Sequence, residues 1–227
     1  MNLKKLFFVI AALFCAQGVP SAAEEMKTLQ LLKPGMTGGK PLMQALQERR
    51  SERAILGKEL PPQLLSDLLW AAAGINRPDS GKRTAPSAMN WQEISVYAAM
   101  PKGLYLYNAA ANALEQVVPR DIRPEAGLQP AALAAPVLLL YVADSKKMSK
   151  AKPDMRDFYS AADTGFISQN VYLFCASEGL ATVVMGGIDR ERLSKEMALR
   201  PEQKVILVQP VGYPEPEEKP AGTPEKK

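Results

Sequence analysis

Three arginines and a serine lie within five residues of one another, at Arg49, Arg50, Ser51 and Arg53. A guanidinium group presents a planar fork of N–H donors that matches the oxygens of a phosphate in pairs, and a hydroxyl adds one more donor. The spacing therefore predicts a compact phosphate-binding cluster. The alternative is a solvated basic end of the preceding helix, because helix C-termini favour cations.

A second stretch, from residue 83 to residue 92, reads Arg-Thr-Ala-Pro-Ser-Ala-Met-Asn-Trp-Gln. Small side chains in its middle would allow the backbone to approach a flat ligand closely. The same pattern is also compatible with an ordinary turn that has proline at its corner.

A glycine pair, Gly186 and Gly187, follows a short apolar run and precedes Asp189. It is either a tight turn between a strand and a helix or a place where backbone amides are open to a ligand. A phosphate-binding cluster, a loop of small residues and open amides together suit a planar, phosphorylated cofactor.

The chain contains no histidine, and its two cysteines are Cys15 and Cys175. Serine–histidine–aspartate triads, cysteine–histidine pairs and histidine-ligated metal sites are therefore excluded. We expect Cys175 to be a buried structural thiol, because it lies in an apolar helical stretch. We expect no metal site, and any catalysis must come from a cofactor or from carboxylates.

The N-terminus has the pattern of a signal peptide over residues 1–23: two lysines, an apolar run from Leu6 to Ala16, and Ser-Ala-Ala. We expect cleavage after Ala23 and an exported, periplasmic protein without a membrane span; an uncleaved anchor is the alternative. Cleavage removes Lys4 and Lys5 and no acid, so the net charge falls from +4 to +2. We expect no nucleic-acid binding, because no basic stripe with interleaved aromatic residues is present.

The elements that must position these residues follow from hydrophobic periodicity. The pattern predicts helices at 41–49, from 61 or 62 to 73, at 157–179 and at 189–199, and a short helical piece at 129–134. It predicts strands at 93–100, 114–118, 137–143, 181–185 and 204–214, and a turn followed by a strand within 101–108. In the longest helix, Phe158, Phe166, Val171 and Cys175 are expected to share one broad apolar face.

We predict an α+β domain over residues 41–214, with a mixed, mostly antiparallel sheet covered by helices. Residues 24–40 are a lead-in segment, and residues 215–227 are a charged, proline-rich tail expected to be disordered or draped on a partner.

The motifs occur in an order that resembles the FMN-dependent nitroreductase family. The resemblance implies a three-layer sandwich and a homodimer in which Arg49, Arg50, Ser51 and Arg53 hold the FMN phosphate. It implies that the loop with Pro86, Ser87, Ala88, Asn90 and Gln92 packs on the flavin from the neighbouring subunit. Gly186, before Gly187, would offer its amide to the flavin N5 atom, and Lys219 is the candidate for a further phosphate contact. No side chain is required as a catalytic acid.

The resemblance also implies ping-pong electron transfer from a donor, with NAD(P)H a candidate, to a small organic acceptor such as a nitroaromatic or a quinone. An export signal conflicts with NAD(P)H, which is a cytoplasmic donor. The run from Leu69 through Ala88, followed by Gly103 to Asn108, is similar to azoline dehydrogenases, which form thiazoles and oxazoles; it departs from them after Ala88. A flavin carrier without turnover and a structural protein without flavin remain alternatives.

Overall fold

The computed structural model describes residues 26–127 and 133–216. The predicted signal peptide, most of the helical piece predicted at 129–134, and Lys219 lie outside the described residues. Within them, no helix is both long and apolar enough to cross a membrane.

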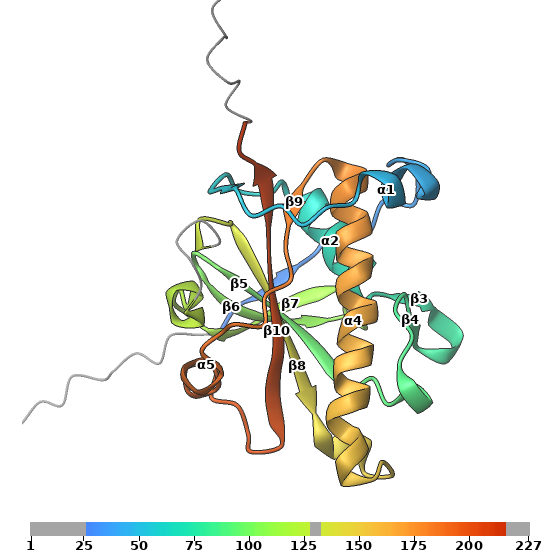
Figure 1. The fold of residues 1–227 in the computed structure, drawn as a ribbon, viewed down its shortest axis with the longest axis vertical. Helices are drawn as coiled ribbons and strands as arrows, with labels where there is room; N and C mark the ends of the chain where they lie inside the picture. The colour runs from blue at the N-terminus through green and yellow to red at the C-terminus, as the bar shows by residue number, and fades with distance from the viewer. Residues whose placement is uncertain (1–25, 128–132, 217–227) are drawn as a thin grey trace, which may run out of the picture.

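An eight-stranded sheet forms the centre of the domain (Figure 1). Its main path runs β1-β7-β6-β5-β8-β10-β2, and β9 pairs with β10. The described strand pairings are antiparallel. The strands are β1 (Thr28–Gln30), β2 (Ile55–Leu56), β5 (Ile94–Met100), β6 (Gly103–Asn108), β7 (Ala113–Val118), β8 (Val137–Asp144), β9 (Ala181–Thr182) and β10 (Gln203–Pro214). The predicted α+β class with a mostly antiparallel sheet is confirmed.

Strand β8 is the central element, as its continuous apolar run predicts. All of its residues are buried, and it pairs with β5 on one side and β10 on the other. The hydroxyl of Tyr141 donates a hydrogen bond to Gln209 Oε1 on β10 at 2.5 Å, so this polar group in the core has a partner.

Helices cover both faces of the sheet and make three layers (Figure 1). On one face, α2 (Pro62–Ala73) and α4 (Pro153–Glu178) contribute Leu68, Leu69, Val171 and Cys175 to a core with β5 and β8. On the other face, α5 (Arg190–Glu196) and a 3₁₀ turn at Arg123–Ala126 pack against the sheet. Proline opens α2 and Gly74 follows its end, as the sequence predicts. The Asp189 side chain caps α5 by accepting a hydrogen bond from the Arg192 amide.

Helix α4 differs from the prediction in two respects. It begins at Pro153, four residues before the predicted start at Asp157, because proline is tolerated in the first turn. The expectation of one apolar face was wrong: Val171 and Cys175 are buried, whereas Phe158 and Phe166 are 63% and 47% exposed. At 100° per residue, Phe166 and Val171 point about 140° apart, so they lie on different sides of the helix.

Three further segments depart from the predicted boundaries. The lead-in contains β1, an edge strand paired with β7. The predicted loop after Gly74 contains a small hairpin, β3 (Ile75–Arg77) with β4 (Lys82–Arg83). The strand predicted at 181–185 is reduced to β9, followed by a single bridge between Met185 and Val208.

Candidate functional site

The arginine cluster begins where α1 (Leu42–Glu48) ends, beside the C-terminal half of α4. Arg49 caps α1, and its guanidinium carbon lies 5.3 Å from the centre of the Tyr172 ring, a cation–π contact. Ser51 Oγ lies 3.0 Å from the Tyr172 hydroxyl. The first half of the cluster is therefore ordered against one aromatic side chain of α4.

Tyr172 also holds the segment that leads to the glycine pair. Its hydroxyl accepts a hydrogen bond from the Val184 amide at 2.8 Å, so its own proton is available to Ser51. Met185 and Val208 exchange two backbone hydrogen bonds directly after this point. The Tyr172 side chain thus brings the arginine cluster and the segment before Gly186 together. The sequence did not indicate this role, because Tyr172 lies in an apolar helical stretch. The polar hydroxyl of a tyrosine within that stretch was the available sign that the side chain has a hydrogen-bonding partner.

A cleft of about 540 Å³ opens beside this cluster. Its lining includes Lys40, Arg49 and Arg50, together with Glu48 and Glu52. Glu48 accepts from Lys40, and Glu52 lies 3.1 Å from Arg50, so three cations and two acids leave the cleft net positive. Ser51 and Arg53 do not line it; Ser51 is turned to Tyr172, and Arg53 is exposed.

The glycine pair is exposed at the surface. A Cβ at Gly187 would meet no described atom within 4 Å, and one at Gly186 would make only an ordinary contact with Leu207 at 3.5 Å. Neither glycine has a positive φ, so the described chain gives no conformational or steric reason for them. Because neither residue carries a side chain, another group could approach this exposed backbone closely.

Cys175 also lines the cleft but is 1% exposed. Burial raises the pKa of its thiol well above its usual value, which disfavours the reactive thiolate. The prediction of a structural thiol is supported. The described residues contain no cluster of acids or cysteines that could hold a metal ion.

The loop from Pro86 to Gln92 is held in a defined, strained shape. Met89, Asn90 and Gln92 have positive φ values of 51°, 55° and 48°. The Ala88 amide donates to Asp163 Oδ2 of α4 at 2.8 Å, and the Gln92 amide donates to Ser87 Oγ at 2.9 Å. Side-chain bonds from Gln92 to Asn90 and from Arg83 to Gln92 close the loop.

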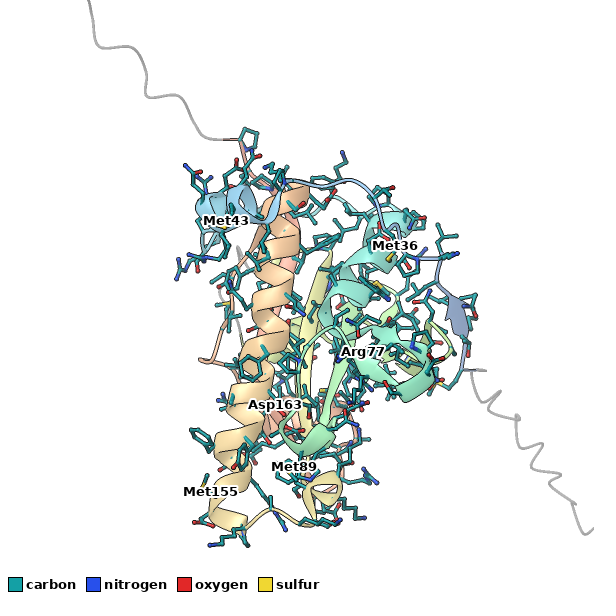
Figure 2. The ribbon with its side chains drawn as sticks, turned by 90° about the vertical axis from the view of Figure 1, so that its right-hand side faces the viewer. Met36, Met43, Arg77, Met89, Met155 and Asp163 are labelled. Atoms are coloured by element: carbon teal, nitrogen blue, oxygen red, sulfur yellow. The ribbon has the colours of Figure 1, made fainter. Side chains whose placement is uncertain are left out.

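Within one chain, the loop and the arginine cluster do not meet. The loop is tied to α4 at Asp163, whereas the cluster is tied to it at Tyr172, nine residues or about 14 Å further along the helix axis. Figure 2 shows Met43 of α1 at one end of α4, and Met89 beside Asp163 toward the other. The structure therefore groups Arg49, Ser51 and the segment before Gly186, and leaves Pro86, Ser87, Ala88, Asn90 and Gln92 as a separate group.

Comparison with known proteins decides the family. The model of the nitroreductase family matches residues 46–213. The chain belongs to the nitroreductase family. A curated nitroreductase-like protein of Methanocaldococcus jannaschii is 26% identical over 181 residues, which are 75% of this chain and 90% of that protein.

Solved structures of nitroreductases agree with this membership. The crystal structure of a nitroreductase-like protein from Ralstonia eutropha JMP134 is 40% identical, with a TM-score of 0.80 over 83% of this chain and 90% of that chain. A chain of the E. coli microcin synthetase McbBCD complex shares the fold at 19% identity, with a TM-score of 0.65 over 92% and 85% of the two chains. The nitroreductase fold and oxidoreductase class expected from the sequence are thus supported.

Replacing Tyr172 with phenylalanine tests the link at this nitroreductase site. The Val184 amide and Ser51 would lose their common partner, and we expect the free energy of unfolding to fall by about 1–2 kcal/mol in urea denaturation. Tyr159→Phe, on the same helix, is the matched control, because that hydroxyl makes no hydrogen bond within the described residues; its effect should stay within about 0.5 kcal/mol. Equal effects of the two changes would show that the link contributes nothing.

Proposed function

We propose that this protein is an exported FMN-dependent oxidoreductase that works as a homodimer. The observation that carries the proposal is the grouping of Arg49, Ser51 and the approach to Gly186 around Tyr172, beside a positively charged cleft. A phosphate monoester carries about two negative charges at neutral pH, and guanidinium forks are its preferred partners. The residues present therefore fit the phosphate end of FMN.

A second cleft, of about 320 Å³, lies between β1, the start of α2 and β6. Its lining is largely aliphatic, including Leu31, Leu60, Leu65 and Val137. We assign the cofactor to the cleft beside the arginines, because a phosphate needs cations and amide donors more than it needs apolar surface.

In this proposal each part of the chain has a separate task. Arg49 and Arg50, which line the cleft, would neutralise the phosphate; Arg53 and Ser51 would turn toward it from just outside the lining, and the amide at Gly186 would face the ring. Bound FMN supplies the hydride and electron chemistry that no side chain here can provide. A donor, with NAD(P)H a candidate, and then a small organic acceptor would use the same pocket in turn, which is a ping-pong scheme.

The homodimer explains why the loop lies apart from the arginine cluster. We propose that Pro86, Ser87, Ala88, Asn90 and Gln92 complete the site of the partner chain. The outward face of α4 supports this arrangement, because Phe158 and Phe166 are exposed there and Gly165 has open space around it. Exposed aromatic side chains around a small residue favour close packing of a second copy. Asp163 and Asn170 of the same helix do not belong to this outward face, because their side chains form hydrogen bonds with Ala88 and Ala71 of their own chain.

One preparation tests the proposal. The chain starting at Glu24 should purify yellow, and native mass spectrometry should give the mass of two chains with two FMN. Adding NADPH under nitrogen should bleach the flavin absorbance, and an acceptor such as a quinone should restore it. FMN that stays oxidised with every physiological reductant would favour a flavin carrier. A colourless protein that does not bind added FMN would refute both enzyme and carrier.

The same mass measurement on material expressed from the full sequence tests export. Cleavage after Ala23 and recovery from the periplasm are the expected results. A retained N-terminus would contradict cleavage without affecting the flavin chemistry, so the two parts of the proposal are tested separately.

A further inference from the structure

Two buried carboxyl groups lie directly behind the Pro86–Gln92 loop. Glu93 precedes β5 and is completely buried, and Asp163 on the inward face of α4 is 2% exposed. Both line a small cavity of about 20 Å³ together with Ser87 and Gln92. Acidic side chains are almost never fully buried unless they have partners, so their environment needs an explanation.

Each carboxyl group holds one point of the loop. Ser87 donates its hydroxyl proton to Glu93 Oε2 at 3.2 Å, and the Ala88 amide donates to Asp163 Oδ2 at 2.8 Å. The second oxygen of Glu93, Oε1, is buried and has no hydrogen-bond partner among the described residues. A buried carboxylate oxygen without a donor is costly, whereas a protonated oxygen could itself donate to the neighbouring carboxylate.

The surroundings favour a neutral Glu93. Burial is the largest of the effects that together raise the pKa of Glu93 to about 7; the nearby negative charge of Asp163 adds to the rise, and hydrogen bonds to the carboxylate oppose it. Other charged groups surround the pair: Arg83 of β4 lines the same cavity, and Asp144, the last residue of β8, donates its backbone amide to the Glu93 carbonyl and forms an ion pair with Arg200. Lys147 follows β8. Lys147 donates to the Gln92 carbonyl and Arg83 to the Gln92 side chain, so both cations bond to the loop. Burial lowers the pKa of each of these two cations.

We propose that Glu93 and Asp163 share one proton, and that this proton holds the Pro86–Gln92 loop in the shape seen here. With the proton present, Glu93 donates to Asp163 and the pair carries one negative charge. When the proton leaves, two carboxylates line the same small buried cavity, and the loop must shift or admit water to separate them. Glu93 and Asp163 are positioning residues, since they reach any ligand only through Ser87 and Ala88.

A tryptophan within the Pro86–Gln92 loop provides the readout. Trp91 packs edge-on against Tyr159, with 5.4 Å between ring centres, and Trp70 is the other tryptophan of the chain. In a Trp70→Phe background, Trp91 fluorescence of the apoprotein should change in one step between about pH 5 and pH 9. The midpoint should lie near the pKa of about 7 given above.

Three variants in that background distinguish the shared proton from a general pH effect. Glu93→Gln imitates the protonated acid, because its amide can donate to Asp163, so the step should disappear. Asp163→Asn removes the like charge, so the midpoint should move to lower pH if Glu93 still titrates in its buried place. Glu59→Gln, at an exposed acid, should leave the wild-type step unchanged. A step that survives in Glu93→Gln, or a flat wild-type titration, would overturn the proposal.

Stability gives an independent measurement. The pKa of Glu93 is about 7 in the folded chain against 4.5 for the unperturbed group, so the folded state binds more protons between these values. The free energy of unfolding should therefore fall as the pH rises through this window, and Glu93→Gln should remove that slope. A slope of equal size in the variant would contradict the assignment even if the glutamine perturbs the loop.

The consequence for the cofactor rests on the proposed function, but the apoprotein titration does not. If FMN binds, its affinity should weaken above neutral pH in the wild type and stay constant in Glu93→Gln. If FMN never binds while the Trp91 step is present, the flavin proposal fails and the shared proton stands.

Discussion

Replacing both Arg49 and Arg53 with alanine should abolish FMN retention without unfolding the protein. Charged hydrogen bonds contribute about 1.5–3 kcal/mol each, so the loss of two guanidinium groups should weaken binding at least about 100-fold. Arg49 is half-buried beside Tyr172 and Arg53 is exposed, so neither replacement leaves a cavity in the core. Binding is measured by quenching of flavin fluorescence, and folding by circular dichroism.

The matched control removes the same charge elsewhere. Lys27 and Lys33 are exposed residues of the N-terminal segment, and neither lines the arginine cleft. Lys27→Ala with Lys33→Ala should leave FMN affinity within about threefold, because screened charges at a distance contribute little. Equal weakening in both double variants would mean that net charge alone attracts FMN. Full retention in the arginine variant would refute the phosphate assignment.

Replacing Phe166 with glutamate should convert the proposed homodimer into monomers. In a symmetric dimer the change introduces two carboxylates into one interface, and each costs several kcal/mol to bury without a partner. We expect dimer affinity to fall at least about 1000-fold, measured by analytical ultracentrifugation. FMN retention should fall with it, because the Pro86–Gln92 loop would no longer reach the partner's arginine cluster.

Met36→Glu is the control for this change, since Met36 is 61% exposed but lies in the lead-in segment rather than on α4. Its dimer and its FMN content should match those of the wild type. A Phe166→Glu protein that stays dimeric would place the interface elsewhere. A monomer that binds FMN as tightly as the wild type would show that one chain is sufficient for the site.

The elements that the sequence predicts well carry local signals. The run that became β8 is apolar at nearly every position, and a strand buried on both faces needs no alternation. Helix α2 has proline at its start and glycine after its end, so its bounds follow from backbone restrictions alone. The Asp189 cap of α5 is another signal of this type.

The elements that it misses depend on partners far along the chain. Strand β1 has three exposed residues and forms only because β7, more than 80 residues later, offers a free edge. Phe158 and Phe166 fit a helical period, but a period does not specify which side of the helix the sheet will cover. Tyr172 has no pattern of its own that marks it as a link.

The sequence by itself determined the chemistry that is possible: arginines suited to a phosphate, a loop of small residues, open glycine amides, and no histidine for acid–base or metal work. Only the tertiary structure decided which of these residues meet. Tyr172 joins Ser51 across 121 positions and Asp163 joins Ala88 across 75. Such pairs are set by how α4 packs on the sheet, and no local preference of the chain encodes that packing.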